Sequence, residues 1–207
     1  HSAIRPELAK MMLTMLNKDI IPVIPQLGSV GASGDLTPLS YLAAAIQGDR
    51  EVYYKGKIVP TMEAFNAEGI KPLPIEAKEG LAIMNGTSVM TAVASLAWKK
   101  AERLAKISDF LTAVTSEITR GKDTPFVAKV SEIKNHKGQI DSAAYVYNII
   151  KDSKRVWRYE EFLKNQIEKL DGKKFVAQTN KIQDRYSIRC APQITGVYRD
   201  TLRFARD

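Results

Sequence analysis

A glycine-rich loop at residues 28–35 holds the residues whose types and spacing suggest chemistry. It reads Gly-Ser-Val-Gly-Ala-Ser-Gly-Asp, and its three glycines permit unusual backbone angles just ahead of an expected helix. One interpretation is a phosphate loop at a helix N-terminus, but no lysine stands where a P-loop needs one and no clear strand pattern precedes the loop. Another is a nucleophilic Ser33, but no histidine is placed to act as its base.

A third interpretation makes the backbone itself the reagent. The amide nitrogen of Gly34 can attack the carbonyl carbon of Ala32, and loss of one water closes a five-membered ring. Loss of the Ser33 hydroxyl as a second water leaves an exocyclic methylene. The residue types suit this route, because Gly34 has no side chain to hinder its amide, Ser33 carries a leaving hydroxyl and Ala32 permits a compressed loop. The product would be a strong electrophile that needs no external cofactor.

The loop and its continuation resemble the signature of the aromatic amino acid ammonia-lyases, which include histidine, phenylalanine and tyrosine ammonia-lyases and related aminomutases. Two further blocks resemble the same family and follow in the family's order. The three blocks are Gly-Ser-Val-Gly-Ala-Ser-Gly-Asp-Leu-Thr-Pro-Leu at 28–39, Lys-Glu-Gly-Leu-Ala-Ile-Met-Asn-Gly-Thr at 78–87 and Gln-Asp-Arg-Tyr-Ser-Ile-Arg-Cys-Ala-Pro-Gln at 183–193. The resemblance spans essentially the whole chain, with least detail between residues 122 and 180.

The resemblance implies roles for particular side chains. Ala32, Ser33 and Gly34 would form the methylidene-imidazolone electrophile, and Asn85 would hydrogen-bond it. Arg189 is the best candidate to hold the substrate carboxylate, because a guanidinium fork matches a carboxylate at two points. Tyr186, three residues earlier, would share a helical face with Arg189 and place an active-site hydroxyl near the electrophile. Gln183 would complete the group by hydrogen bonding. The alternative for each of these residues is a purely structural role, in a turn, in core packing or in a surface contact.

The activity implied is elimination of ammonia from an aromatic L-amino acid, leaving an α,β-unsaturated acid. Arg185 and Met84, with the run at 87–91, favour phenylalanine or tyrosine as substrate. The alternatives are a histidine ammonia-lyase, an aminomutase that re-adds ammonia at the β-carbon, and a truncated homologue that has lost the chemistry. In the family a tyrosine removes the β-proton. We expect that base upstream of His1, so the 207-residue chain alone is predicted to be inactive.

Helical patterns dominate the elements that must position these residues. We expect helices near 6–16, 36–47 (ending at Gly48), 61–68 (capped by Thr61), 139–151, 160–170 and 192–207, and a hairpin over 51–59. The longest, from Thr87 to Thr119, contains no Gly or Pro and would extend about 50 Å. Its seam comprises Leu104, Ile107, Leu111, Val114 and Ile118. Such a helix needs long partner helices.

The fold class is therefore mainly α: a long-helix bundle with a small β-hairpin, part of the helical homotetramer that the resemblance implies. We treat residues 1–207 as a single region in which the electrophile part, about 1–85, runs into the bundle part, about 86–207. The chain begins with His1 rather than an initiator Met, and its first five residues do not resemble a signal peptide. We expect the chain to be a central fragment that is incomplete at both ends.

Composition limits the other classes. Apolar residues make up 44% of the chain, as in a packed domain, and no continuous run of about 18 uncharged apolar residues predicts a membrane span. The net charge is +8, but the basic residues are dispersed among carboxylates, so nucleic-acid binding is a third-ranked alternative. With one cysteine and two histidines we expect no metal site and a cytoplasmic protein. Cys190 is assigned to buried packing, and His136 has no catalytic role.

Overall fold

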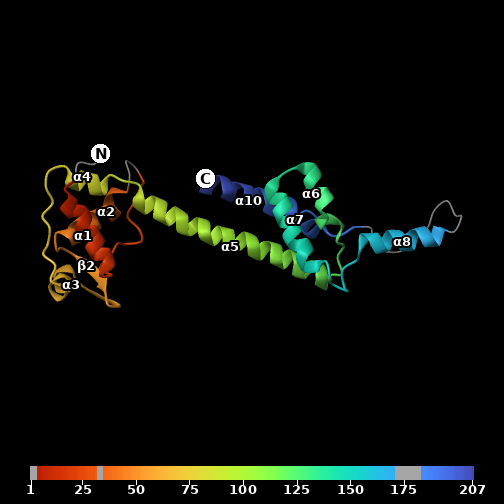
Figure 1. Cartoon of the computed structure of the whole chain (residues 1–207), viewed down its shortest axis with the longest axis horizontal. Helices are drawn as coiled ribbons and strands as arrows, with labels where there is room; N and C mark the ends of the chain where they lie inside the picture. The colour runs from red at the N-terminus through yellow and green to blue at the C-terminus, as the bar shows by residue number, and fades with distance from the viewer. Residues whose placement is uncertain (1–3, 32–34, 171–182) are drawn as a thin grey trace. The chain divides into compact units, whose positions relative to one another are not determined.

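The computed structural model describes residues 4–31, 35–170 and 183–207. It divides into two compact units, an N-terminal unit of residues 1–95 and a C-terminal unit of residues 96–207, and each is described by itself (Figure 1). The boundary falls within the long helix α5, Ser88–Ile118. The sequence-based division between the electrophile part and the bundle part, at about residue 85, lies just before this helix begins.

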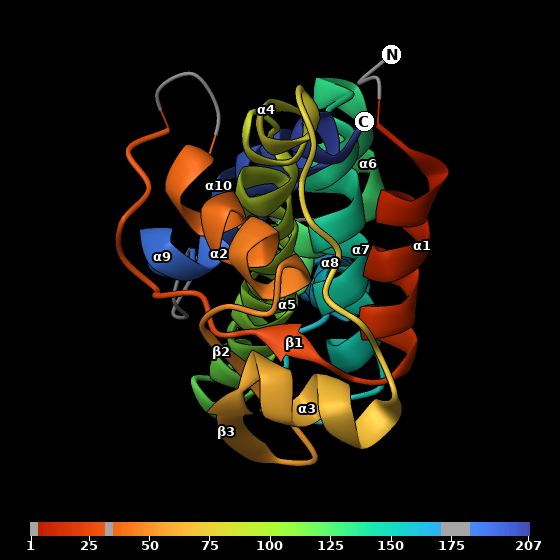
Figure 2. The ribbon, with the colours of Figure 1, turned by 90° about the vertical axis from the view of Figure 1, so that its left-hand side faces the viewer.

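The N-terminal unit combines short helices with a small sheet. Figures 1 and 2 show the sheet and α3 at one end of this unit and α4 at the other, with α1 and α2 between them. In chain order the elements are α1 (Pro6–Asn17), β1 (Ile21–Pro22), α2 (Leu36–Ile46), β2 (Glu51–Tyr54), β3 (Lys57–Pro60), α3 (Thr61–Glu68), α4 (Glu79–Met84) and the first residues of α5.

The predicted hairpin is confirmed, and a third strand extends it. β2 and β3 pair antiparallel around Lys55 and Gly56, whose φ angles of 48° and 78° are those of a tight hairpin turn. β1 pairs antiparallel with the other edge of β2 and gives the order β1-β2-β3. β1 was not predicted because two residues, one of them a proline, carry no strand periodicity.

The predicted helices α1, α2 and α3 are confirmed, with one difference at a cap. α3 ends at Gly69 in the left-handed conformation, as its glycine predicts. The assignment of Thr61 as the cap of α3 is wrong. Thr61 is instead the first residue of the helix, and its hydroxyl donates to the carbonyl oxygens of Asp49 and Arg50. The side chain therefore ties α3 to the start of β2.

Apolar side chains from helices and sheet form the core of the N-terminal unit. The apolar faces of α1 and α3 point into the unit, where they pack in one cluster with buried residues of β2. The buried members are Leu8, Met15, Ile20, Ala45, Ile46, Val52, Tyr54, Ala64 and Phe65. This core fixes α2, which follows the electrophile loop directly.

The C-terminal unit is helical throughout most of its described residues. Predicted helices at 139–151, 160–170 and 192–207 correspond to α7, α8 and α10. α6 was not anticipated, and α9 was anticipated only as the helical turn that Tyr186 and Arg189 would share. The elements are the rest of α5, a 3₁₀ turn at Thr124–Phe126, α6 (Ala128–Lys134), α7 (Lys137–Ile150), α8 (Tyr159–Leu170), α9 (Tyr186–Arg189) and α10 (Ala191–Arg206). Its core contains Ala113, Phe126, Val146, Ile150, Val156 and Ile188.

A buried polar network joins three helices of this unit. The carboxylate of Asp109 on α5 accepts from the Ser142 hydroxyl of α7 at 2.6 Å. It also accepts from Arg199 of α10, at 3.0 Å from Nε and 2.6 Å from Nη2. Close approach of α7 and α10 requires glycine at positions 138 and 196, where a β-carbon would overlap the backbone of the opposite helix.

The predicted seam of α5 is not the face that the C-terminal unit buries. Ala105, Asp109, Ala113 and Ser116 are buried, whereas Leu104, Ile107, Leu111 and Ile118 of the seam are exposed. The absence of a continuous run of about 18 uncharged apolar residues still holds, although one helix among the described residues is long and apolar enough, by length and composition alone, to cross a membrane. Residues 79–118 contain an 18-residue window with a mean hydropathy of 1.3. Val, Leu, Ile, Ala and Met raise this average, and the Ser and Thr residues between them interrupt any continuous apolar run. A helix that packs in a bundle has the same composition.

Candidate functional site

The proposed electrophile residues Ala32, Ser33 and Gly34 lie outside the described residues. The structure does describe both flanks of the tripeptide. On its N-terminal side, the Gly31 amide donates to the Ser29 hydroxyl at 3.3 Å, and that hydroxyl donates to Oδ1 of Asp35 at 2.7 Å. The two ends of the loop are therefore joined through Ser29 and Asp35.

Asp35 also connects the loop to the segment that contains Asn85. Its backbone N–H donates to the carbonyl oxygen of Gly86 at 3.1 Å, and its Oδ2 accepts from the amide of Met90 at 2.6 Å. Its side chain is buried although it carries the charge of a carboxylate. Asn85 is exposed at the C-terminal end of α4, next to Gly86. The structure thus brings together two of the three blocks on which the resemblance rests, the loop and the asparagine segment.

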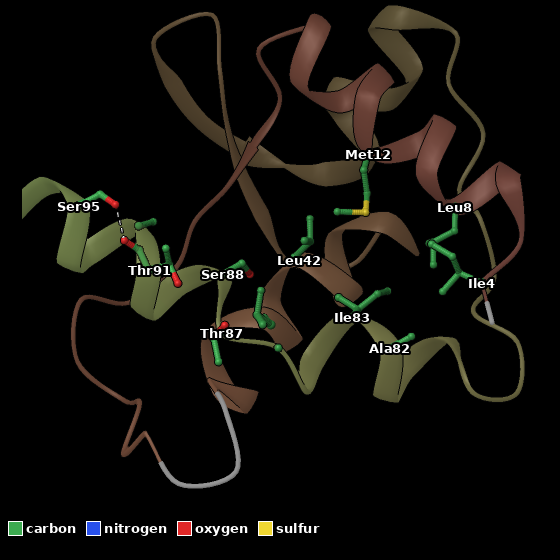
Figure 3. Close-up of a pocket in the computed structure, with 13 residues that line it drawn as sticks. Ile4, Leu8, Met12, Leu42, Ala82, Ile83, Thr87, Ser88, Thr91 and Ser95 are labelled. Carbon is green, nitrogen blue, oxygen red and sulfur yellow. Dashed lines mark hydrogen bonds between the residues drawn. The ribbon is translucent and has the colours of Figure 1, made fainter. Parts of the chain in front are cut away.

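Gly86, the residue after Asn85, lines a groove of about 720 Å³ in the N-terminal unit. Figure 3 shows Ile4, Leu8 and Met12 on one side of it and Ala82 and Ile83 of α4 on another. Leu39, Leu42, Gly86 and Ala92 also line the groove, as do four hydroxyl side chains near the start of α5: Thr87, Ser88, Thr91 and Ser95. The groove is mainly apolar, and none of the described residues that line it is charged.

The second group of predicted residues lies in the C-terminal unit. Tyr186 and Arg189 are the first and last residues of α9, and the guanidinium carbon of Arg189 is 5.5 Å from the centre of the Tyr186 ring. The shared face predicted for these two residues is therefore confirmed. Gln183 is exposed three residues before α9 begins, and Tyr186 is also exposed. Because Asn85 lies in the other unit, the structure describes these two groups separately.

Two polar atoms near α9 are buried without a hydrogen-bond partner among the described residues. They are Nε of Arg189 and Oε1 of Gln193, one a donor and the other an acceptor. A buried donor or acceptor without a hydrogen bond typically costs about 1–3 kcal/mol of stability. This cost favours a bonding partner for each of the two atoms, supplied by the substrate or by protein atoms beyond the described residues. Gln193 was not singled out from the sequence. It lies in the first turn of α10, four residues after Arg189, which ends α9.

The assignment of Cys190 to buried packing is only partly correct. Cys190 is a free, half-buried cysteine at the junction of α9 and α10. A hydrogen bond with the Cys190 side chain raises the pKa of Tyr186 above its usual value, and Arg189 opposes this effect. Tyr186 therefore remains a neutral phenol at physiological pH and can donate a hydrogen bond. His136 is an exposed residue that precedes α7. Among the described residues no cluster of three His, Cys, Asp or Glu side chains could hold a metal ion.

Comparison with known proteins agrees with this arrangement. The family model for aromatic amino acid lyases matches residues 1–207. A histidine ammonia-lyase of Stigmatella aurantiaca is 41% identical over 206 residues, which are 100% of this chain and 37% of that protein.

Solved structures give the same result. The crystal structure of a tyrosine aminomutase from Streptomyces globisporus has a TM-score of 0.85 at 37% identity, covering 100% of this chain and 39% of the other. Phenylalanine ammonia-lyase from Rhodosporidium toruloides has a TM-score of 0.81 at 30% identity, covering 99% of this chain and 29% of the other. The chain thus spans well under half the length of the relatives it matches. These matches confirm the predicted mainly helical fold class, and the chain belongs to the aromatic amino acid lyase family.

Proposed function

We propose that residues 1–207 form the central part of an ammonia-lyase that eliminates ammonia from an aromatic L-amino acid. Ala32, Ser33 and Gly34 condense into a methylidene-imidazolone, with Gly34 nitrogen bonding to the Ala32 carbonyl carbon and two waters leaving. This group is an electrophile that draws the substrate amine away as a leaving group. No external cofactor is required.

One observation carries the proposal most directly. The hydrogen bond from Asp35 to the carbonyl of Gly86 joins the residue after the tripeptide to the residue after Asn85. An asparagine amide at this position can hydrogen-bond an electrophile formed by the tripeptide. A match to the family over the entire chain supports the same assignment.

The remaining proposed site residues lie in α9 and in the segment that precedes it. We assign Arg189 to the substrate carboxylate, Tyr186 to a hydroxyl near the reacting centre and Gln183 to a supporting hydrogen bond. The Nε of Arg189, which has no partner among the described residues, and the neutral state of Tyr186 support these assignments. Arg189 is also a fork with two parallel donors, which suits a carboxylate better than a single ammonium would.

Histidine is the substrate that we now favour. The sequence patterns at Arg185 and Met84 favoured phenylalanine or tyrosine. However, the curated relatives that share 38–41% identity with this chain are named histidine ammonia-lyases. Tyrosine and phenylalanine remain second candidates because the solved structures that match include a tyrosine aminomutase and a phenylalanine ammonia-lyase.

The active enzyme is proposed to be a cytoplasmic homo-oligomer, with a tetramer expected for this family. The exposed seam of α5, Leu104, Ile107, Leu111 and Ile118, supports association of long helices, since four apolar side chains at helical spacing form a stripe. The matched relatives are much longer than this chain. We therefore propose that the base that removes the β-proton lies outside residues 1–207, and that this segment alone is inactive.

The test uses the full-length protein that contains this segment. Intact mass should be lower than the encoded mass by two waters, and the variant Ser33→Ala should lack that loss. L-Histidine, L-tyrosine and L-phenylalanine are then offered, and ultraviolet absorbance of each acrylate is followed. Ser40→Ala is the matched control, because its hydroxyl donates within α2, to the carbonyl oxygen of Thr37. Full activity in Ser33→Ala would refute the proposal.

An aminomutase is the second candidate, favoured by the TM-score of 0.85 to a tyrosine aminomutase. It would produce a β-amino acid from the same electrophile. Separation of α- and β-amino acids after incubation distinguishes the two activities, because a lyase alone accumulates the acrylate and ammonia.

A further inference from the structure

The short helix α4, which ends beside Asn85, is held near both ends by hydrogen bonds to residues distant in sequence. Beyond its C-terminal end, the backbone amide of Asp35 donates to the Gly86 carbonyl, and the Asp35 carboxylate accepts from the Met90 amide in α5. At its N-terminal end the first residue of the helix, Glu79, is paired with Arg5. Arg5 immediately precedes α1 and lies 74 residues away in sequence.

The pair between Arg5 and Glu79 has an unusually complete set of hydrogen bonds. Oε1 of Glu79 accepts from the Arg5 amide at 3.0 Å and from Nε at 2.9 Å. Oε2 accepts from Nη2 of Arg5 at 2.8 Å and from the amide of Glu76 at 2.9 Å. Arg5 further donates to the Glu76 carboxylate and to the carbonyl of Pro74, both at 2.7 Å. Glu79 is only 2% exposed at its side chain, so this carboxylate is a buried, fully bonded anchor.

Among the described residues, two contacts link α4 to the part of the unit that contains α1: Ile83 packs against the core, and Glu79 bonds to Arg5. The helix has six residues, too few to be stable by itself. It packs on α2, but the groove separates it from Ile4, Leu8 and Met12 (Figure 3). The pair between Arg5 and Glu79 therefore bridges the two sides of the groove at one end.

We propose that Arg5 and Glu79 are positioning residues for Asn85: they fix the start of α4, and through this short helix they set where Asn85 meets the electrophile loop. The inference rests on the proposed function, in which Asn85 bonds the electrophile. Neither residue is assigned a contact with the substrate.

The charge state of the pair suits this role. Hydrogen bonding from Arg5, with further bonds from the backbone, lowers the pKa of Glu79 to about 2. The anchor is therefore charged throughout the pH range in which the enzyme would operate, and its strength does not change with pH there.

The test compares two variants of the pair in the full-length protein with a matched control. Glu79→Gln keeps the shape but removes the charge, and Arg5→Lys keeps the charge but removes the two-point fork. The control is Glu68→Gln. Glu68 lies in the same unit on α3, its pKa is also lowered to about 2, and it bonds Tyr54 and Lys18 rather than α4.

We expect Glu79→Gln to lower kcat by about 10- to 100-fold, with a smaller change in KM, because misplacing a catalytic group by about 1 Å has effects of this order. Arg5→Lys should lie between this variant and the wild type. Glu68→Gln should leave kcat within about twofold of the wild type, because Glu68 lies on α3 and bonds Tyr54 and Lys18 rather than α4. Hydrogen exchange of the amides of residues 85–90 should become about tenfold faster in Glu79→Gln and unchanged in Glu68→Gln.

The outcomes separate the two proposals. If the wild type forms no acrylate from any of the three amino acids, the proposed function fails, and amide exchange alone decides whether the pair positions Asn85. If Glu79→Gln is folded and its kcat and exchange equal those of the wild type, the positioning role is overturned. If Glu79→Gln does not fold, Arg5→Lys decides by the same two measurements. Equal losses in Glu68→Gln and Glu79→Gln would mean general destabilisation and would also overturn it.

Discussion

The carboxylate of Asp35 accepts a hydrogen bond from the backbone amide of Met90, 55 residues later, with 2.6 Å between Oδ2 and N. The same carboxylate accepts from the Ser29 hydroxyl through its other oxygen. One buried anion thus joins the start of the electrophile loop, its end and the first turn of α5. A negative charge is also favourable at a helix N-terminus, where amides lack intrahelical partners.

Removing this anion should loosen the loop and the helix start together. Asp35→Ala leaves the Met90 amide and the Ser29 hydroxyl without this acceptor, so the free energy of unfolding should fall by about 1–3 kcal/mol. Asp35→Asn should lose less, because its amide oxygen can still accept from Met90 and its amide nitrogen can donate to Ser29. Urea unfolding of the full-length protein measures the loss, and intact mass shows whether the ring still forms. Equal stability of Asp35→Ala and wild type would contradict this role of Asp35.

The sequence predicted those elements that contain a local signal, such as a periodic apolar pattern, a terminating glycine or a turn. α3 was found because Gly69 ends it, and the hairpin because Lys55 and Gly56 form a turn with positive φ angles. β1 and α4 were missed, since two and six residues are too short for a periodic pattern and depend on contacts distant in sequence.

The candidate site was predicted to a similar extent. The resemblance identified Asn85, and spacing placed Tyr186 and Arg189 on one face. The bond from Asp35 to Met90 and the pair between Arg5 and Glu79 were not predicted, because they join residues 55 and 74 apart. For α5, periodicity located an apolar stripe but not the face that packs within the unit, which contains Asp109. A buried Asp is unexpected from hydropathy alone and depends on its partner Arg199.

The network around Asp109 should contribute strongly to the stability of the C-terminal unit. Arg199→Ala leaves a carboxylate that is 1% exposed without its cation, so the free energy of unfolding should fall by about 3–5 kcal/mol. Arg203→Ala is the matched control on the same helix, because its partners Asp141 and Asp200 are about one-third exposed; its loss should be within about 1 kcal/mol. Urea unfolding monitored by circular dichroism checks both. Similar losses for the two arginines would show that burial of Asp109 is not decisive.

Acid should destabilise the N-terminal unit through two carboxylates. Glu79 and Glu68 have pKa values of about 2 in the folded protein against 4.5 for an ordinary Glu, owing mainly to hydrogen bonds from Arg5 and from Tyr54 respectively. Since the folded pKa is the lower one, this stabilisation is complete above about pH 4.5 and disappears as the pH falls towards 2.

Thermal unfolding between pH 2 and pH 7 tests this sign. The wild type should lose stability steeply below about pH 4.5, and Glu79→Gln or Glu68→Gln should each show a shallower fall, because one titrating carboxylate has been removed. At pH 7 both variants should be less stable than the wild type. A steeper acid fall in either variant would mean that its carboxylate does not have the lowered pKa in the folded protein.

Cys190 should control the titration of Tyr186. Its side chain raises the pKa of the phenol, so Cys190→Ala should lower that pKa towards the ordinary value of about 10. Ultraviolet absorbance at alkaline pH follows phenolate formation, and the difference between wild type and Tyr186→Phe isolates the signal of this residue. Tyr198→Phe on α10, which is also exposed, is the control for the other tyrosines. An unchanged midpoint in Cys190→Ala, with α9 intact, would mean that the Cys190 side chain does not raise the pKa of Tyr186.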